Sequence, residues 1–342
     1  MNVRPRPMEP SDVEQCVEHM AAHPVLGPRY GRLIDQVPSA IRFALANEAI
    51  TFNVFEELQG STTRFLGAGM ALCVSDHFVH ELKTTPLFWV GPELVKRITC
   101  GKSPLLSPAE VGDANSAAGL NLLTWHLTCH PEVLRSGEVG TIIMTSYDHL
   151  YRGLRLREVI GQADCLEHLH GMRHAGGLYF DRFLGACENY PEVNVRNFSD
   201  EPHNCFMTRD LALTHAPSWI SSLFLSYEPP RLSLSRSQAR LLRAALDGET
   251  DEQLSDRLGI SIHAVKMTWR MIYDRVAMCL PDLLSDSSRK DGEMRRRGKE
   301  KKQRLLDYVR KHPEELHPVS RKHLHQDTTQ RTKSPSLLFR VG

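Results

Sequence analysis

The chain has 342 residues with a formal net charge of +1, and 41% of the residues are hydrophobic. This length predicts two or three domains, and the composition is typical of a soluble globular protein. No apolar run approaches the roughly 20 residues of a membrane-spanning helix, and the N-terminus lacks the apolar core of a secretory signal, so we expect a cytoplasmic protein.

The eight cysteines are scattered along the chain, and no two of them form a Cys-x-x-Cys pair. A chain of this size does not depend on disulfides for a stable core. We therefore expect reduced thiols, most of them buried.

The charges are distributed unevenly along the chain. After Pro230 lie 24 of the 42 Lys and Arg residues but only 15 of the 41 Asp and Glu residues. The near-neutral total therefore combines an acidic N-terminal part with a basic C-terminal part. This division is consistent with a module that neutralises nucleic-acid phosphates, and equally with a solvated basic helix.

Residues 1–202 alternate polar helical stretches with short apolar runs, which predicts a mixed α/β domain. The first helix is expected at residues 11–23, with Ser11 as its N-cap, Glu14 completing a capping box and Pro24 ending it.

The next elements are three strands and two helices. Residues 49–56 and 65–74 are predicted to form an antiparallel strand pair because only a short turn separates them. A third strand is expected at residues 120–128. Helices are expected at about residues 140–152 and 155–169.

The second half of the chain divides into three parts. Residues 203–230 are predicted as a linker, because the chain becomes less regular there and Glu228, Pro229 and Pro230 cannot continue a helix. A helical DNA-binding domain is expected at residues 231–285. Residues 286–342 are predicted as a basic tail with a helix at residues 301–311 and a polar, partly disordered end.

The strongest pattern lies in residues 234–276, which divide into three helices. Ser235 begins the first and Gly248 closes it, Thr250 with Gln253 forms the capping box of the second, and Ser261 caps the third.

The third helix has two distinct faces. Its apolar residues recur at the spacing of one helical face, which predicts burial of that side. The opposite face carries His263, Lys266, Met267 and Arg270, together with Asp274. Cations in this position suit a helix that enters the major groove of DNA.

This segment resembles the helix-turn-helix of LuxR-type transcription regulators. The residues that carry the resemblance are Leu234 and Ser235, Gly248, Leu258 to Ser261, and Val265 and Lys266. The resemblance implies that Lys266 contacts DNA, that His263, Met267, Thr268 and Arg270 share the interface, and that the protein binds as a dimer. The chain departs from the family pattern at Gln238, Ala264 and Thr268, where the family usually has an acidic residue, Thr and His.

The N-terminus is similar to the start of GNAT acyltransferases, with a strand containing Val3 followed by a helix that opens near Ser11. Activity in that family requires a pyrophosphate-binding loop of the form Arg/Gln-x-x-Gly-x-Gly/Ala after the central strand. The corresponding residues 129–140 contain glycines at the wrong spacing. We therefore expect a non-catalytic domain without a cofactor, which senses a small-molecule ligand or forms a dimer.

Two groups of histidines were considered as metal ligands. Cys165, His168, His170 and His174 have suitable chemistry, but their spacing does not place all four on one helical face. His126 and His130 are less suited still, because a strand would alternate the side chains and Pro131 breaks any helix that would align them. We expect no metal site.

These observations predict a dimeric DNA-binding transcription regulator that recruits or blocks RNA polymerase. Two alternatives stay open: an acyltransferase with an appended helical domain, and an adaptor whose three helices bind protein. Acyl-CoA binding to the N-terminal half would favour the first, and absence of DNA affinity would favour the second.

Overall fold

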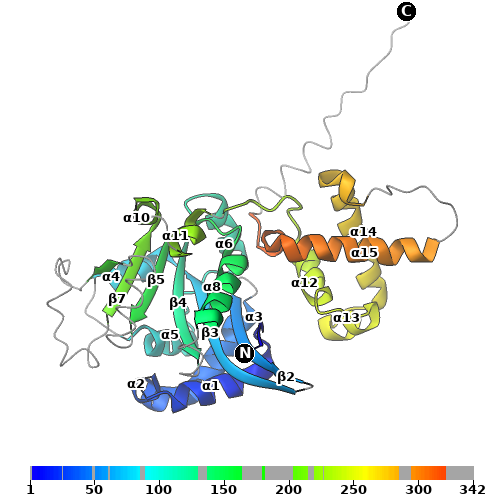
Figure 1. Ribbon diagram of the computed structural model, residues 1–342. Helices are drawn as coiled ribbons and strands as arrows, with labels where there is room; N and C mark the ends of the chain where they lie inside the picture. The colour runs from blue at the N-terminus through cyan, green and yellow to red at the C-terminus, as the bar shows by residue number, and fades with distance from the viewer. Residues whose placement is uncertain are drawn as a thin grey trace, which may run out of the picture. The chain divides into compact units, whose positions relative to one another are not determined.

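The computed structural model describes residues 2–24, 26–47, 51–60, 62–84, 89–129, 137–163, 179–181, 203–214, 219–225, 227–284 and 294–320. The chain divides into two compact units, and Figure 1 shows the elements of each. The first unit comprises residues 1–108 and 118–227, and the second comprises residues 109–117 and 228–342. Among the described residues, no helix is both long enough and apolar enough to cross a membrane.

A mixed sheet forms the centre of the first unit (Figure 1). Its order is β1-β2-β3-β4-β5-β7-β6, and every neighbouring pair is antiparallel except β4 and β5, which are parallel. The strands are β1 (Val3–Pro7), β2 (Thr51–Gln59), β3 (Thr62–Val74), β4 (Leu120–Cys129), β5 (Leu156–Ala163), β6 (Tyr179–Asp181) and β7 (His203–Thr208).

Helices cover both faces of this sheet. On one face, a hydrophobic core includes side chains from α1 (Val13–Ala22), α3 (Val37–Ala46), α4 (Asp76–Thr84) and α5 (Val90–Thr99). On the other face, the ring of Tyr147 in α8 (Gly137–Tyr151) lies 6.3 Å from the ring of Phe55. The remaining elements in the described part of this unit are η1 (Pro10–Asp12), α2 (Leu26–Tyr30), η2 (Gly31–Gln36), α10 (Arg209–Thr214) and α11 (Trp219–Leu225).

A close approach of α8 to the sheet requires Gly69 in β3. A Cβ atom at this position would lie 1.4 Å from the hydroxyl oxygen of Tyr147. Both Tyr147 and the stacked Tyr151 are buried, and burial raises the pKa of each phenol well above its usual value. Gly69 therefore allows two neutral tyrosines to pack against the strand.

An ion-pair network joins β1 to the start of α1. Arg6 donates to both carboxylate oxygens of Asp12, at 2.6 and 2.7 Å, and to Glu56 of β2 at 2.8 Å. Arg4 also donates to Glu56, at 2.8 Å. Because Asp12 and Glu56 are buried, the arginines compensate charges that would otherwise be costly to remove from water.

The predicted strands and the mixed α/β class agree with the structure, whereas two local predictions are wrong. The N-terminal cap of the first helical segment is a reciprocal pair between Glu9 and Asp12, not between Ser11 and Glu14. The segment predicted as a helix at residues 155–169 begins instead as strand β5, and residues beyond Ala163 lie outside the described part.

Residues 203–225, which we predicted as part of a linker, belong to the first unit. Strand β7 pairs with both β5 and β6, and α10 and α11 follow it. The pairing with β5 supplies the backbone hydrogen bonds that a linker would lack. The division between the units falls between Tyr227 and Glu228.

The secondary-structure elements in the described part of the second unit are helices. They include α6 (Pro108–Ser116), most of which belongs to this unit, α12 (Arg236–Ala245), α13 (Asp251–Leu258), α14 (Ile262–Cys279), η4 (Pro281–Leu283), α15 (Met294–Lys311) and η5 (Pro313–Leu316). The core joins α12, α13 and α14 with Leu305, Leu306 and Val309 of α15. The helix expected in the basic tail is therefore present, but one side of it is part of the core.

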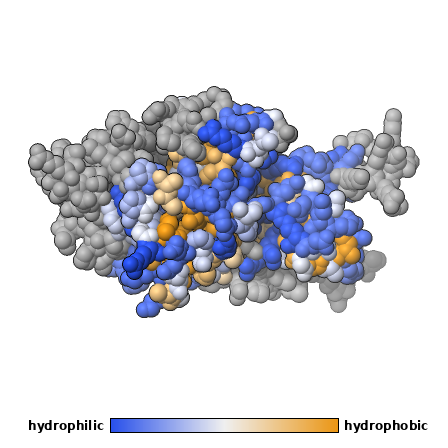
Figure 2. All heavy atoms as spheres, turned by 90° about the horizontal axis from the view of Figure 1, so that it is seen from below, coloured by the Kyte–Doolittle hydropathy of each residue, from blue (hydrophilic) through white to orange (hydrophobic). Residues whose placement is uncertain are grey.

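Figure 2 shows that the visible face of the helical unit is largely hydrophilic, with a hydrophobic area at one end. In the described part of this unit, several large apolar side chains are exposed to solvent, among them Ile260, Met267, Met271 and Met278. Three of these four lie on α14. The exposed side of α14 is therefore both basic and apolar.

Candidate functional site

The caps of the three helices α12, α13 and α14 follow directly from their sequences. Ser235 and Thr250 each accept a hydrogen bond from the backbone three residues later, and Gln238 and Gln253 complete reciprocal capping boxes. Ser261 accepts from the backbone N–H of Ala264 and starts α14. These contacts satisfy backbone donors that a helix start leaves without intrahelical partners.

A short turn joins α13 to α14. Gly259 ends α13 with φ of 63° and ψ of 35°, a left-handed conformation that glycine adopts without strain. The hydroxyl of Ser255 donates to the carbonyl of Ile260 at 2.5 Å across the same turn. The turn therefore fixes the direction in which α14 leaves α13.

The exposed side of α14 carries most of the residues expected to contact DNA. His263, Lys266, Met267 and Arg270 are all exposed, whereas Val265 on the opposite side is fully buried. A helix that buries one side and exposes cations along the other can place them against phosphates and base edges.

Thr268 does not share this surface. Its side chain is buried, and its hydroxyl donates to the carbonyl of Ala264 at 2.8 Å. The resemblance to LuxR-type regulators placed a contact residue here, but the hydroxyl is used within the helix.

Helix α15 is anchored to the other helices by a polar contact as well as by its apolar residues. The ammonium of Lys302 lies 3.0 Å from Oδ1 of Asp251 at the start of α13. The same ammonium lies 4.8 Å from the ring centre of Trp269 in α14. One cation of the segment predicted as a basic tail therefore stabilises the packing of three helices.

The first unit contains a pocket where β4 and β5 part. The two strands pair only from Leu120 with Leu156 to Leu123 with Ile160. Beyond this point the backbone N–H of Val90, at the start of α5, donates to Oε1 of Gln162 in β5 at 2.9 Å. The lining of the pocket includes Tyr30, Trp89, Val90, Thr124, His126 and Gln162.

A bulge in β4 explains the side chains in this pocket. Met70 of β3 is opposite His126 and Ala71 is opposite Thr124, so Trp125 is the extra residue. The bulge lets two consecutive side chains reach the same partner, because Trp125 Nε1 donates to Tyr30 Oη at 3.0 Å and Tyr30 Oη contacts His126 Nε2.

His126 is neutral in this setting. Burial, and to a smaller extent the electrostatic effects of His23 and Arg29, together lower its pKa to about 3. The ring therefore accepts a hydrogen bond from Tyr30 Oη, which itself accepts from Trp125. Gly91 permits this arrangement, because a Cβ there would lie 2.2 Å from Tyr30 Oη.

Several residues of the histidine groups lie outside the described residues. Cys165, His168, His170, His174 and His130 belong to this set, as do residues 130–136 of the segment compared with the pyrophosphate loop. Within the described part of the chain, Glu228, His312 and Glu314 form a group with metal-ligating chemistry. We did not predict it, because Glu228 and His312 are 84 positions apart in the sequence and only the His-x-Glu spacing was visible locally.

Comparisons with known proteins give structural similarities only. No family model matches the chain, and no curated protein matches it. The GphF GNAT-like decarboxylase in complex with isobutyryl-CoA aligns with a TM-score of 0.34 and 12% identity, over 60% of this chain and 98% of its own. The loading GNATL domain of CurA from Lyngbya majuscula gives a TM-score of 0.33 and 11% identity, over 61% of this chain and 98% of its own.

A variant of the spermidine N-acetyltransferase SpeG from Vibrio cholerae also aligns. Its TM-score is 0.31 and its identity 11%, over 60% of this chain and 94% of its own. Scores and identities of this size carry no conclusion about activity or ligands.

Proposed function

We propose that the protein is a sequence-specific DNA-binding transcription regulator that reads DNA with α14. The observation that supports this is the exposed row of His263, Lys266 and Arg270 on a helix whose opposite side is core. The fixed turn at Gly259 and the start of α14 at Ser261 present the N-terminal half of this helix as a rigid element.

In this proposal, Lys266 and Arg270 lie one helical turn apart and approach the major groove together. Arg270 reads a base edge, most favourably guanine, because its planar guanidinium can form two parallel hydrogen bonds. A dimer places two copies of α14 in successive major grooves, about one turn of DNA apart, and positions the protein to recruit or block RNA polymerase.

The test is selection of DNA sequences by the full-length protein at two salt concentrations. Wild type should enrich a short, nearly palindromic site, and Lys266→Ala and Arg270→Ala should each weaken binding to it by about 1 to 3 kcal/mol. Lys96→Ala is the matched control, since it removes an exposed cation from the first unit. Its binding should equal that of wild type.

Binding without sequence enrichment, lowered equally by all three substitutions, would contradict the proposal and favour the adaptor. The exposed Met267, Met271 and Met278 suit that alternative, because flexible methionines bind protein surfaces of varied shape.

A second candidate function for the first unit is binding of a small molecule, or acyl transfer, at the pocket between β4 and β5. The cavity of about 10 Å³ admits a water-sized group between aromatic residues and polar groups such as Gln162, so a larger ligand has to open it. Titration of the full-length protein with acyl-CoA tests it. Saturable binding that Gly91→Leu abolishes would favour this function, and no binding would exclude acyl-CoA as the ligand.

A further inference from the structure

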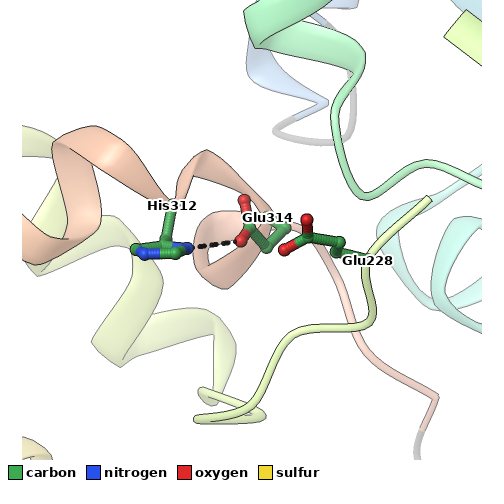
Figure 3. Close-up of side chains that lie close together, drawn as sticks. All are labelled: Glu228, His312 and Glu314. Atoms are coloured by element: carbon green, nitrogen blue, oxygen red, sulfur yellow. Dashed lines mark hydrogen bonds and ion pairs between the residues drawn. The ribbon is translucent and has the colours of Figure 1, made fainter. Parts of the chain in front are cut away.

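Three potential metal ligands meet at the C-terminal end of α15 (Figure 3). His312 follows the last residue of α15, Glu314 lies in η5, and Glu228 lies in the segment that precedes α12. The ligand atoms of the three side chains are all within 4.8 Å of one another. His312 Nδ1 and Glu314 Oε1 are 2.8 Å apart, as the dashed line in Figure 3 shows.

The surrounding contacts hold two of the three ligands in place. The ring of Tyr308 stacks on the ring of His312, with centres 4.3 Å apart and an angle of 27° between the planes. Glu314 is 2% exposed, so its carboxylate has little freedom to turn into water. Glu228, by contrast, is exposed to solvent.

A second set of hydrogen bonds brings the segment after Glu228 to η5. Glu315 is fully buried and accepts from the backbone N–H groups of Arg231 at 3.2 Å and Leu232 at 2.7 Å. The hydroxyl of Tyr308 also donates to Glu315, at 2.8 Å. Glu315, next to Glu314, therefore holds η5 against the segment that follows Glu228 without using any of the three ligands, and such supporting contacts orient ligands in metal sites.

We propose that Glu228, His312 and Glu314 bind a divalent transition-metal ion, best matched by Zn²⁺. One imidazole nitrogen and two carboxylate oxygens suit zinc, and they exclude the soft copper(I) ion, which prefers sulfur. The burial of Glu314 next to Glu315 concentrates negative charge, and a bound cation offsets it. Water completes the coordination.

The geometry requires a small adjustment. Ligands about 2.1 Å from a tetrahedral zinc lie roughly 3.4 Å from one another, so atoms as much as 4.8 Å apart must close by about 1.4 Å. Rotation of the exposed Glu228 supplies most of this movement. The ion replaces the hydrogen between His312 and Glu314 and joins the start of the segment before α12 to the end of α15.

The experiment is a titration of metal-free, full-length protein with Zn²⁺ by isothermal calorimetry. Wild type should show a site that Glu228→Gln and His312→Gln each weaken by at least tenfold, because each removes one ligand. Glu228→Gln is the principal variant, since an exposed side chain can change without disturbing the core. His80→Gln, which removes an exposed histidine of the first unit, is the matched control and should bind like wild type.

Circular dichroism of the metal-free variants provides the second measurement. Zinc should raise the melting temperature of wild type and of His80→Gln, and this increase should be lost in Glu228→Gln. Zinc binding of equal affinity in wild type, Glu228→Gln and His312→Gln would place the ion elsewhere and overturn the proposal. No binding in wild type would overturn it as well, and the contact between His312 and Glu314 would then be an ion pair alone.

Discussion

The indole Nε1 of Trp269 donates to Oδ1 of Asp251 at 3.2 Å, and this oxygen also lies 3.0 Å from the ammonium of Lys302. Asp251 is the first residue of α13, Trp269 lies in the middle of α14, and Lys302 belongs to α15. One carboxylate therefore connects three helices at the place where α14 is oriented for its proposed role. An acidic residue in the first turn also interacts favourably with the positive end of the helix dipole.

Asp251→Ala should destabilise the helical unit by about 1 to 2 kcal/mol, because it removes a charged acceptor from the Trp269 indole and the partner of Lys302. Urea unfolding followed by circular dichroism measures this change. Asp256→Ala is the control, since it removes an exposed carboxylate from the same helix. Equal stability of the two variants would show that the contact contributes nothing.

Thr268→Val should leave DNA binding within about twofold of wild type, whereas Lys266→Ala should weaken it by about 1 to 3 kcal/mol. The reason is that Thr268 is buried and its hydroxyl donates within α14, so it offers DNA no group. Fluorescence anisotropy with the selected site measures both. A large loss in Thr268→Val, at unchanged melting temperature, would mean that DNA reaches this side of α14.

The pattern of α14 predicted its buried face because Val265, Trp269, Ile272 and Val276 follow the helical period, and all four are buried. The caps at Ser235, Thr250 and Ser261 were equally visible, since they depend only on neighbours in sequence.

Features that depend on distant partners were not visible in this way. Leu156, Val159 and Ile160 fit a helical period as well as a strand buried on both faces, and only the pairing of β5 with β4 and β7 decides between them. The role of Lys302 depends on residues 33 and 51 positions earlier, Trp269 and Asp251. The group of Glu228, His312 and Glu314 likewise arises from the folding of η5 onto the segment before α12.

Arg6→Met should destabilise the protein by about 3 kcal/mol at neutral pH, because Asp12 and Glu56 would remain as buried charges without their main partner. Thermal and urea unfolding measure the loss. Arg42→Met is the control, since Arg42 pairs with Glu14 where both side chains are about half exposed, and it should change stability by less than about 0.5 kcal/mol.

The same variant should show a characteristic pH dependence. Burial raises the pKa of Asp12 and Glu56, but hydrogen bonds and the charge of Arg6 outweigh burial and lower both below their usual values. A carboxylate with a lowered pKa stabilises the fold above its unfolded pKa, and this stabilisation is lost as the pH falls through the folded pKa. The difference between wild type and Arg6→Met should therefore shrink at acid pH, and a constant difference would argue against the ion pairs as its cause.

His126 should make the stability of the first unit depend on pH between about pH 6.5 and pH 5. Asp12 and Glu56 stay ionised in this range and do not contribute to the dependence. Burial lowers its pKa from 6.5 to about 3, so the unfolded chain binds a proton that the folded chain excludes between these values. The stabilisation is complete above pH 6.5 and is lost as the pH falls, by about 1.5 kcal/mol between pH 6.5 and pH 5.

His126→Gln should remove this slope whatever its effect on the absolute stability, because glutamine does not titrate. Urea unfolding of both proteins at several pH values from 7 to 5 gives the two slopes. His80→Gln is the control, since His80 is exposed and the slope of wild type should persist in that variant. If the slope survives in His126→Gln, another group is responsible for it. The description of His126 as a neutral acceptor for Tyr30 in the pocket between β4 and β5 would then be wrong.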